Sequence, residues 1–343
     1  MKIILDAMGG DNAPEAVVLG ALDAAKDFNT EIILVGRGED ILASLKKNGI
    51  SDLPAGVAIA NADDVVDMHD DPAAVLHKRK NSSMVVGLKM LAEGQGDAFV
   101  SAGSTGALLT AATLVVKRVK GIRRAAMAPA FPNKTGGKTI ICDCGANAEC
   151  TPEFLLQFAI VGSLHAKKSL GIANPRVGLL NIGTEDSKGT ALQLAVYPML
   201  VDAHEKGLIN FIGNVEARQV PMGEVDVVVC DGFSGNVLLK SIEGTAMFLG
   251  SKISGMFKKN LVSKLAAVLV MKDIKAFKKL LDYREIGGTQ FLGIKKPVIK
   301  AHGSSDARAF YNAVRQAVDA ANNNTAEELE AALKQISVAK EKA

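Results

Sequence analysis

The feature that most constrains the fold is a pattern that repeats along the chain: a short apolar run, a turn rich in Gly, Asp or Ser, and then a helical segment. The apolar runs expected to be strands are residues 2–6, 31–35, 97–100, 138–142, 176–180, 225–230 and 298–301. Strands that alternate with helices of ten or more residues are typical of a parallel, doubly wound sheet. We therefore predict an α/β fold with three layers, α/β/α, around a mostly parallel sheet.

The length of the chain bears on its division into domains. At roughly 150 residues per domain, 343 residues make two domains or one large one. No linker marks a boundary, so we expect one large α/β catalytic domain over residues 1–343, with room for a second lobe. A C-terminal helix is expected over residues 325–343, because Thr325 and Glu328 form a capping box and Leu329, Leu333 and Ile336 share one face.

Composition excludes several classes of function. The net charge is only +3, aromatic residues make up 4% and Trp is absent, which argues against nucleic-acid binding. No apolar run approaches the length of about 20 residues that a spanning helix needs, and the N-terminus lacks a signal-peptide core, so a cytoplasmic protein is expected. Cys142, Cys144 and Cys150 do not have the spacing of a zinc site, and no metal is expected.

Polar residues follow six of the predicted strands. They are Asp6, Ser101, Asp143, Asn181, Asp231 and His302. Ligands of open α/β sheets bind beyond the carboxyl ends of the strands. We therefore expect these six residues to lie together on one edge, where glycines and helix N-termini suit an anion.

The turn at residues 101–106 is the strongest candidate for phosphate binding, because Ser104, Thr105 and Gly106 open a helix. An ordinary capped helix start is the alternative. A P-loop is absent, and Gly36-x-Gly38 lacks the third glycine of a dinucleotide site. The chain also lacks a G-x-S-x-G nucleophile elbow, which favours direct attack by a bound substrate.

Two residues in these turns are candidates for catalysis. Lys188 lies in the turn after residues 176–180, where it either neutralises an anion or is an ordinary surface lysine. Asn236 follows Asp231 by five residues, and its amide is suited to donate to a phosphate or an oxyanion.

Residues 251–281 form a basic amphipathic segment that contains eight lysines and one acidic residue. The apolar residues Ile253, Phe257, Leu261, Leu265 and Val268 are spaced as one helical stripe. Such a helix either lies on anionic lipid, docks an acidic protein, or packs in a core or dimer interface. A second basic run, residues 117–124, is either a docking surface for an acidic carrier or merely solvated.

Taken in order, eight motifs resemble the PlsX family of bacterial phosphate acyltransferases. The matching stretches begin at Asp6, Lys80, Ser101, Asp143, Gly178, Phe211, Asp231 and Ala301, and the resemblance covers residues 1 to about 320. It implies an α/β/α fold like that of phosphotransacetylases and isopropylmalate dehydrogenases. Asn12 departs from the histidine that is frequent in the family, and Cys144 departs from an apolar residue.

The resemblance also implies a reaction, in which acyl-[acyl carrier protein] and inorganic phosphate give acyl phosphate and the free carrier. The product then feeds a membrane glycerol-phosphate acyltransferase. A homodimer associated peripherally with the membrane is implied, with no metal or organic cofactor. Membrane or partner contacts fall on Ile253, Phe257, Lys258, Lys259, Leu261, Lys264 and Leu265.

The expected mechanism combines this resemblance with the turn chemistry. Lys188 and Asn236 are the expected catalytic residues, Asn236 as an oxyanion donor and Lys188 to neutralise the phosphate or the leaving thiolate. The expected phosphate and substrate contacts are Asp6, Gly9, Gly10, Ser101, Ser104, Thr105, Gly106, Asp143, Asn147, Asn181, Thr184, Asp231, Ser234 and His302. Two alternatives are a short-chain phosphotransacylase that uses coenzyme A, and a non-catalytic membrane scaffold that recruits acyl carrier protein.

Overall fold

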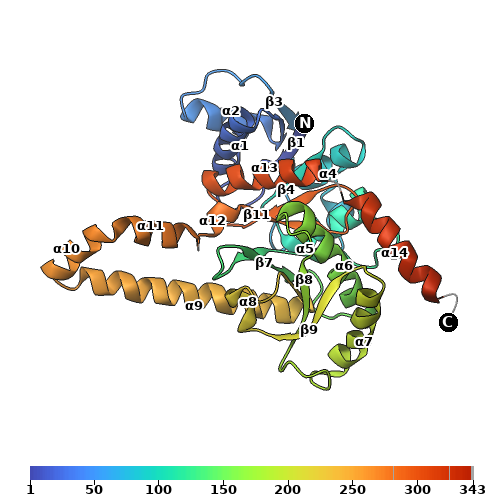
Figure 1. Cartoon of the computed structure of the whole chain (residues 1–343). Helices are drawn as coiled ribbons and strands as arrows, with labels where there is room; N and C mark the ends of the chain where they lie inside the picture. Colours follow the sequence, from blue (N-terminus) through green and yellow to red (C-terminus); the bar gives the residue numbers. More distant parts are fainter. Residues whose placement is uncertain (281, 324, 341–343) are drawn as a thin grey trace.

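The computed structural model describes residues 1–280, 282–323 and 325–340, and its strands form two sheets (Figure 1). The first sheet has the strand order β3-β2-β1-β4-β12-β11-β5, and the second has the order β6-β7-β10-β8-β9. Strands β11 and β6 pair with their neighbours antiparallel, and the other pairs are parallel. The predicted α/β class with mostly parallel strands is confirmed, and the strands are divided between two sheets.

The first sheet draws on both ends of the chain. Its strands are β1 (Lys2–Asp6), β2 (Glu31–Gly36), β3 (Val57–Asn61), β4 (Ala98–Ser101), β5 (Ala126–Met127), β11 (Gly288–Leu292) and β12 (Val298–Ala301). The helices around it are α1 (Glu15–Phe28), α2 (Gly38–Lys47), α3 (Val75–Lys78), α4 (Ser83–Ala92), α5 (Thr105–Ala111), the π-helical turn η1 (Ala112–Val116), α12 (Tyr283–Ile286) and α13 (Ala307–Asn322).

The second sheet comes from the middle of the chain. Its strands are β6 (Ala130–Pro132), β7 (Lys138–Cys142), β8 (Arg176–Asn181), β9 (Asn210–Glu216) and β10 (Val227–Val229). The remaining helices are α6 (Pro152–Ser169), α7 (Ala191–Glu205), α8 (Gln219–Met222), α9 (Gly232–Lys258), α10 (Leu261–Leu269), α11 (Met271–Leu280) and α14 (Ala326–Lys340).

The first sheet is covered on both faces, as strand β1 shows. Ile3 and Leu5 pack in one apolar cluster with α1 and α13, whereas Ile4 packs in another with α4 and α5. Successive side chains of a strand point to opposite faces, so a strand that is apolar at every position must be buried on both. This arrangement is the three-layer packing that the continuous apolar runs predict.

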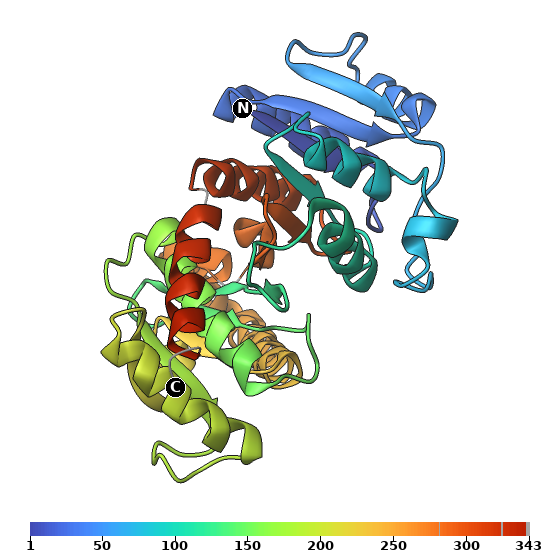
Figure 2. The ribbon, with the colours of Figure 1, turned by 90° about the vertical axis from the view of Figure 1, so that its right-hand side faces the viewer.

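The two sheets with their helices form two lobes, which Figure 2 shows side by side. Helix α14 returns from the first lobe to the second, where Leu329 and Leu333 are buried in the cluster that contains α6. The predicted C-terminal helix is therefore present. The side chain of Ile336 and residues 341–343 lie outside the described residues.

Helices α9, α10 and α11 form an arm that projects from the second lobe (Figure 1). The expectation of one helical stripe is wrong here, because Asn260 adopts an extended backbone and caps a new helix by accepting from the Ser263 N–H at 2.8 Å. Ile253 and Phe257 consequently lie on α9, and Leu261 on α10. The last predicted residue, Leu281, lies outside the described residues. Among the described residues, no helix is both long and apolar enough to cross a membrane.

Candidate active site

The six polar strand ends lie on two sheets rather than on one edge. Strands β1, β4 and β12 are neighbours in the first sheet and end at Asp6, Ser101 and Ala301, the residue before His302. Strands β7, β10 and β8 are neighbours in the second, and Asp143, Asp231 and Asn181 occupy their ends. This partition corrects the expectation of a single edge, since sheet membership depends on pairing between distant segments.

Asp6 and Ser101 brace two loops of the first lobe. The Ser101 hydroxyl donates to the Asp6 carboxylate at 2.6 Å, and the Met8 N–H donates to it at 3.2 Å. A Cβ at Gly9 would lie 2.6 Å from that carboxylate, so these loops approach closely. Burial raises the pKa of Asp6, partly offset by the hydrogen bond from Ser101. Gly10 has a φ of +99°, which suits glycine at this turn.

In the second lobe, Asp143 is the buried carboxylate that holds a loop by accepting hydrogen bonds, as Asp6 does in the first lobe. The Asp143 carboxylate accepts from the backbone N–H of Met127 at 2.8 Å, of Cys144 at 2.7 Å and of Asn147 at 2.6 Å. The Asn147 side chain adds a bond at 3.0 Å and also donates to the Ala125 carbonyl at 2.9 Å. Asp143 and Asn147 therefore organise the loop after β7. Burial raises the pKa of Asp143.

The second lobe also fixes the start of α9. The Asp231 side chain accepts from the Ser234 N–H and from its hydroxyl, both at 2.8 Å, which caps the helix. A Cβ at Gly235 would lie 2.0 Å from the Asp143 carbonyl oxygen, so glycine allows the helix to pack against the loop after β7. Asn236 follows in the first turns of this fixed helix.

A pocket of about 310 Å³ lies between the lobes and brings together residues from both. Thr105, Lys300 and His302 line it from the first lobe, and Asn236, Lys240 and Glu243 line it from α9. Three of the predicted site residues, Thr105, Asn236 and His302, are thus brought together. Ser104 occupies the N-cap position of α5, where it is buried and its side chain makes no capping hydrogen bond, and Gly106 follows Thr105 in the first turn of the helix.

Lys300, Lys240 and Glu243 line this pocket and were not among the predicted site residues, and Lys300 is the more buried of the two lysines. Its ammonium donates to the carbonyl of Ala102 at 3.3 Å and to the carbonyl of Ala301. It forms no ion pair within the described part of the chain. Burial lowers the pKa of Lys300 to about 8, and Asp6 and Asp11 act in the opposite direction. A lysine inside the buried strand 298–301 is the signal that would have drawn attention to it.

His302 and Lys240 complete the polar lining. The His302 ring nitrogen Nδ1 lies 2.8 Å from the Ser304 hydroxyl oxygen. Burial lowers the pKa of His302, and the nearby cations Lys240 and Lys300 lower it further, so the neutral ring is favoured at neutral pH. Lys240 is held by Glu243 in an exposed ion pair at 2.7 Å.

The loop after β8 stands apart from this pocket. Lys188 is exposed and does not line the pocket, and its carbonyl accepts from the Asn181 side chain at 2.9 Å. Thr184 lines a different groove, together with Glu216 and Arg218. The strand order places β8 beyond β10, so this loop starts one strand farther from the first lobe.

The arm carries exposed apolar residues at its tip. Leu261 is 78% exposed, Leu265 70% and Leu269 87%, and no residue of α10 is buried. Ile253 is also exposed, and Phe257 is half-buried. The lysines Lys258, Lys259 and Lys264 are exposed beside them. Clusters of apolar side chains open to water are typical of interaction surfaces in proteins.

Comparisons with known proteins show to which family the chain belongs. The family model of the fatty acid synthesis protein matches residues 1–328. The chain belongs to this family. A phosphate acyltransferase of Thermoanaerobacterium thermosaccharolyticum is 45% identical over 317 residues, 92% of each chain. A phosphate acyltransferase of Bacillus licheniformis is 44% identical over 336 residues, 98% of this chain and 99% of that one. The resemblance read from the motifs is therefore confirmed, and the chain is an acyltransferase.

Solved structures support the fold of this fatty acid synthesis protein. A phosphotransacetylase from Streptococcus pyogenes superposes with a TM-score of 0.61 at 20% identity, over 96% of this chain and 94% of that one. The EutD phosphotransacetylase from Staphylococcus aureus gives 0.59 at 18% identity, over 94% of both chains. At these identities the likeness concerns the fold alone, and it confirms the predicted relation to phosphotransacetylases.

Proposed function

We propose that this enzyme transfers a long-chain acyl group from acyl-[acyl carrier protein] to inorganic phosphate. One observation carries the proposal: the pocket between the lobes holds a partly buried lysine, Lys300, without a carboxylate partner among the described residues, and Asn236 of α9 lines the same pocket. An ammonium that is largely withdrawn from water favours an anion as its partner. We take phosphate to be that anion. The similarity to phosphate acyltransferases indicates that the group transferred to it is an acyl group.

Phosphate is held by groups of the first lobe in this proposal. The Lys300 ammonium and the Thr105 hydroxyl line the pocket, and the first turn of α5, with Ser104 and Gly106, adds backbone N–H groups. These groups orient one phosphate oxygen toward the thioester carbonyl. Bringing the two reactants together removes much of the entropic part of the barrier.

The reaction needs no nucleophile from the protein. A phosphate oxygen attacks the carbonyl carbon, a C–O bond forms and the carbonyl oxygen becomes an oxyanion that the Asn236 amide stabilises. The C–S bond then breaks and the carrier leaves as thiolate, which takes a proton from water. A free thiol has a pKa of about 8.5, so the leaving group needs little acid help. His302 accordingly binds substrate rather than serving as an acid.

Lys188 is proposed to act as a second cation, which neutralises the phosphate or the leaving thiolate. Its loop, with Asn181 and Thr184, lies outside the pocket in a single chain, so the role of Lys188 depends on approach of that loop to the substrate.

The arm is proposed to bind the surface of an anionic membrane. Exposed apolar side chains at its tip, among them Leu261 and Leu265, would enter the interface, and Lys258, Lys259 and Lys264 would contact anionic headgroups. The enzyme would thus act in the cytoplasm, peripherally on the membrane. Acyl phosphate would reach a membrane glycerol-phosphate acyltransferase there. We also propose the homodimer that the resemblance implies.

The proposal is tested by measuring acyl phosphate formed by the purified enzyme from long-chain acyl carrier protein and phosphate. A matched reaction replaces the carrier with coenzyme A. Product that requires both carrier and phosphate supports the proposal. Product with coenzyme A alone would assign the enzyme to the short-chain phosphotransacylases. Binding of carrier or lipid without any product would favour the scaffold.

A further inference from the structure

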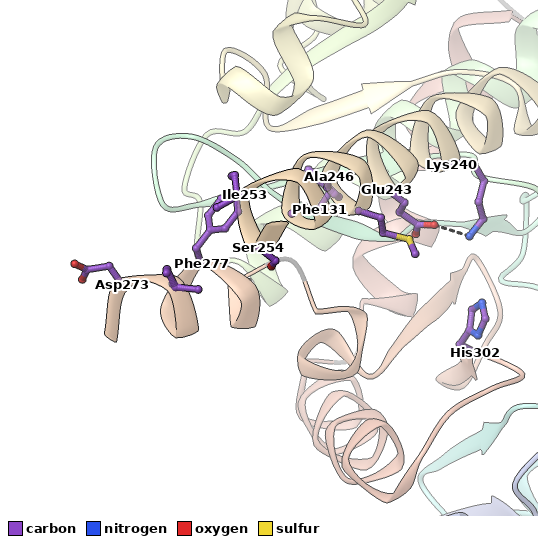
Figure 3. Close-up of a pocket in the computed structure, with 12 residues that line it drawn as sticks. Phe131, Lys240, Glu243, Ala246, Ile253, Ser254, Asp273, Phe277 and His302 are labelled. Atoms are coloured by element: carbon purple, nitrogen blue, oxygen red, sulfur yellow. Dashed lines mark hydrogen bonds and ion pairs between the residues drawn. The ribbon is translucent and has the colours of Figure 1, made fainter. Parts of the chain in front are cut away.

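A second cavity, of about 450 Å³, lies between α9 and α11 on the inner side of the arm (Figure 3). This cavity is here called the arm groove. Figure 3 shows Phe277 and Asp273 on α11 at its outer end, with Ile253 and Ser254 on α9, and His302 at the opposite end near Lys240. The size is in the range of small-molecule sites in proteins.

The arm groove adjoins the pocket between the lobes, because Phe131, Lys240, Glu243 and His302 line both cavities. A molecule whose reacting end lies beside Lys300 and Asn236 can therefore extend past these four side chains into the arm. The path leads away from the core and toward the exposed tip of the arm.

Polar and apolar groups are separated along this path. The titratable side chains of the arm groove are Lys240, Glu243 and His302 at the inner end, and Asp273 at the outer end. Apart from Ser254, the other residues of the lining are apolar: Phe131, Ala246, Met247, Ile253, Ile274 and Phe277, with Gly250. Met247 is 75% exposed and Phe277 is 46% exposed, so this lining is open to solvent. An apolar chain would remove it from water.

The length of the arm groove fits a long acyl chain. From Glu243 to Ser254 the α9 backbone advances eleven residues, which is about 16 Å at 1.5 Å per residue. An extended chain of roughly a dozen methylenes spans this distance at ordinary carbon–carbon bond lengths. A short acyl group would occupy only the inner end.

We infer that the arm groove binds the acyl chain of the substrate, and that the residues on its walls set the preference for chain length. This inference rests on the proposed acyl transfer and adds the site of the chain to it. Each methylene buried in the groove contributes about fourfold to binding. A residue that blocks the groove halfway therefore weakens long chains selectively.

Gly250 provides the test, because a Cβ at this position meets no atom within 4 Å and the residue lines the arm groove. Gly244 is the matched control: it lies on the same helix, its Cβ also meets no atom within 4 Å, and it does not line the groove. Gly250→Leu and Gly244→Leu make the same change in helix propensity. The kcat/KM of each variant is measured with palmitoyl- and butyryl-carrier at saturating phosphate.

Gly250→Leu is expected to lower kcat/KM for the palmitoyl substrate at least tenfold, which corresponds to two or more lost methylene contacts. The value for the butyryl substrate, and both values for Gly244→Leu, should stay within twofold of the unmodified enzyme. Equal changes for both chain lengths, or no change, would overturn the inference. A shift in sedimentation with equal effects on both substrates would assign the groove to a second copy of the chain, which also overturns it. Absence of acyl phosphate from the unmodified enzyme would instead refute the proposed function.

Discussion

Replacing Lys300 by methionine separates what this lysine contributes to the reaction from what its burial costs the fold. The pKa of Lys300 is lowered by burial from 10.5 to about 8. The unfolded chain therefore binds more protons than the folded one between these values. This difference disfavours the folded state at pH 7 by about 3 kcal/mol. Methionine keeps the length of the side chain and removes this term.

The increase in the free energy of unfolding that Lys300→Met brings is reduced, because methionine cannot make two hydrogen bonds of the lysine. The ammonium donates to the carbonyls of Ala102 and Ala301, and their loss costs roughly 1–2 kcal/mol together. We expect Lys300→Met to raise the free energy of unfolding by about 1–2 kcal/mol at pH 7. Stability of the unmodified enzyme rises with pH through this window, so the gain should vanish by about pH 9.5.

The activity should change in the opposite direction. A phosphate oxygen about 4 Å from the ammonium gains up to about 4 kcal/mol at an effective dielectric constant of 20. Helix α5 and Thr105 retain part of the binding, so the loss is set at about 2–4 kcal/mol, or roughly 30- to 1000-fold in kcat/KM for phosphate. The unmodified enzyme should also lose kcat/KM above about pH 8, as Lys300 deprotonates, and the variant should lack this decline.

The assay combines urea unfolding at pH 7 and pH 9.5 with phosphate saturation curves from pH 6.5 to 9.5. Lys300→Arg is the control that keeps a cation and does not deprotonate in this range. The reasoning is refuted if Lys300→Met is less stable at pH 7 and keeps its kcat/KM for phosphate within threefold. A decline above pH 8 that persists in Lys300→Met would assign it to another group.

Three further predictions concern the other candidate residues. Asn236→Ala should lower kcat about 100-fold with less than a threefold change in KM for phosphate in steady-state assays, because its amide acts on the oxyanion; a rise in KM alone would contradict this. Lys188→Ala should lower turnover more than tenfold while circular dichroism shows an intact fold, and near-normal turnover would exclude its role. Leu265→Glu should weaken sedimentation with anionic vesicles at least tenfold and leave turnover on the carrier substrate in solution unchanged, whereas equal vesicle binding would argue against the arm as the membrane contact.

Local patterns in the sequence were sufficient to predict the class of fold and seven of the described strands, whereas β3, β5, β6, β9 and β11 were not among the predicted runs. Strand β1 is apolar at each position from Ile3 to Leu5, which requires cover on both faces, and the structure provides it with α1 and α13 on one side and α4 on the other. The start of α9 was also readable, since Asp231 precedes it as a capping residue and Asn236 follows within the first turns. The succession of motifs indicated the family as well.

Interactions between distant segments decided what the sequence left open. The polar strand ends at Asp6 and Asp143 look alike in the sequence, yet they belong to different sheets because their strands pair with different partners. The arm was misread as one helix, because the apolar spacing continues across Asn260, whose backbone is extended and whose side chain caps a new helix.

At the candidate site, Lys300 and Lys188 also show what the sequence indicates and what only the tertiary structure decides. In the sequence each is a lysine near the carboxyl end of a strand, and only Lys188 was chosen, because it lies in a loop at the predicted active edge. In the structure the strand that carries Lys300 lies between β4 and β11, which partly buries this lysine and places it in the pocket between the lobes. The sequence by itself determined the class of fold, seven of the described strands and the chemical groups at their ends, because hydrophobic periodicity and capping act over a few residues. The tertiary structure alone decided which groups meet and which charge is buried, because strand pairing and burial depend on contacts between residues far apart in the chain.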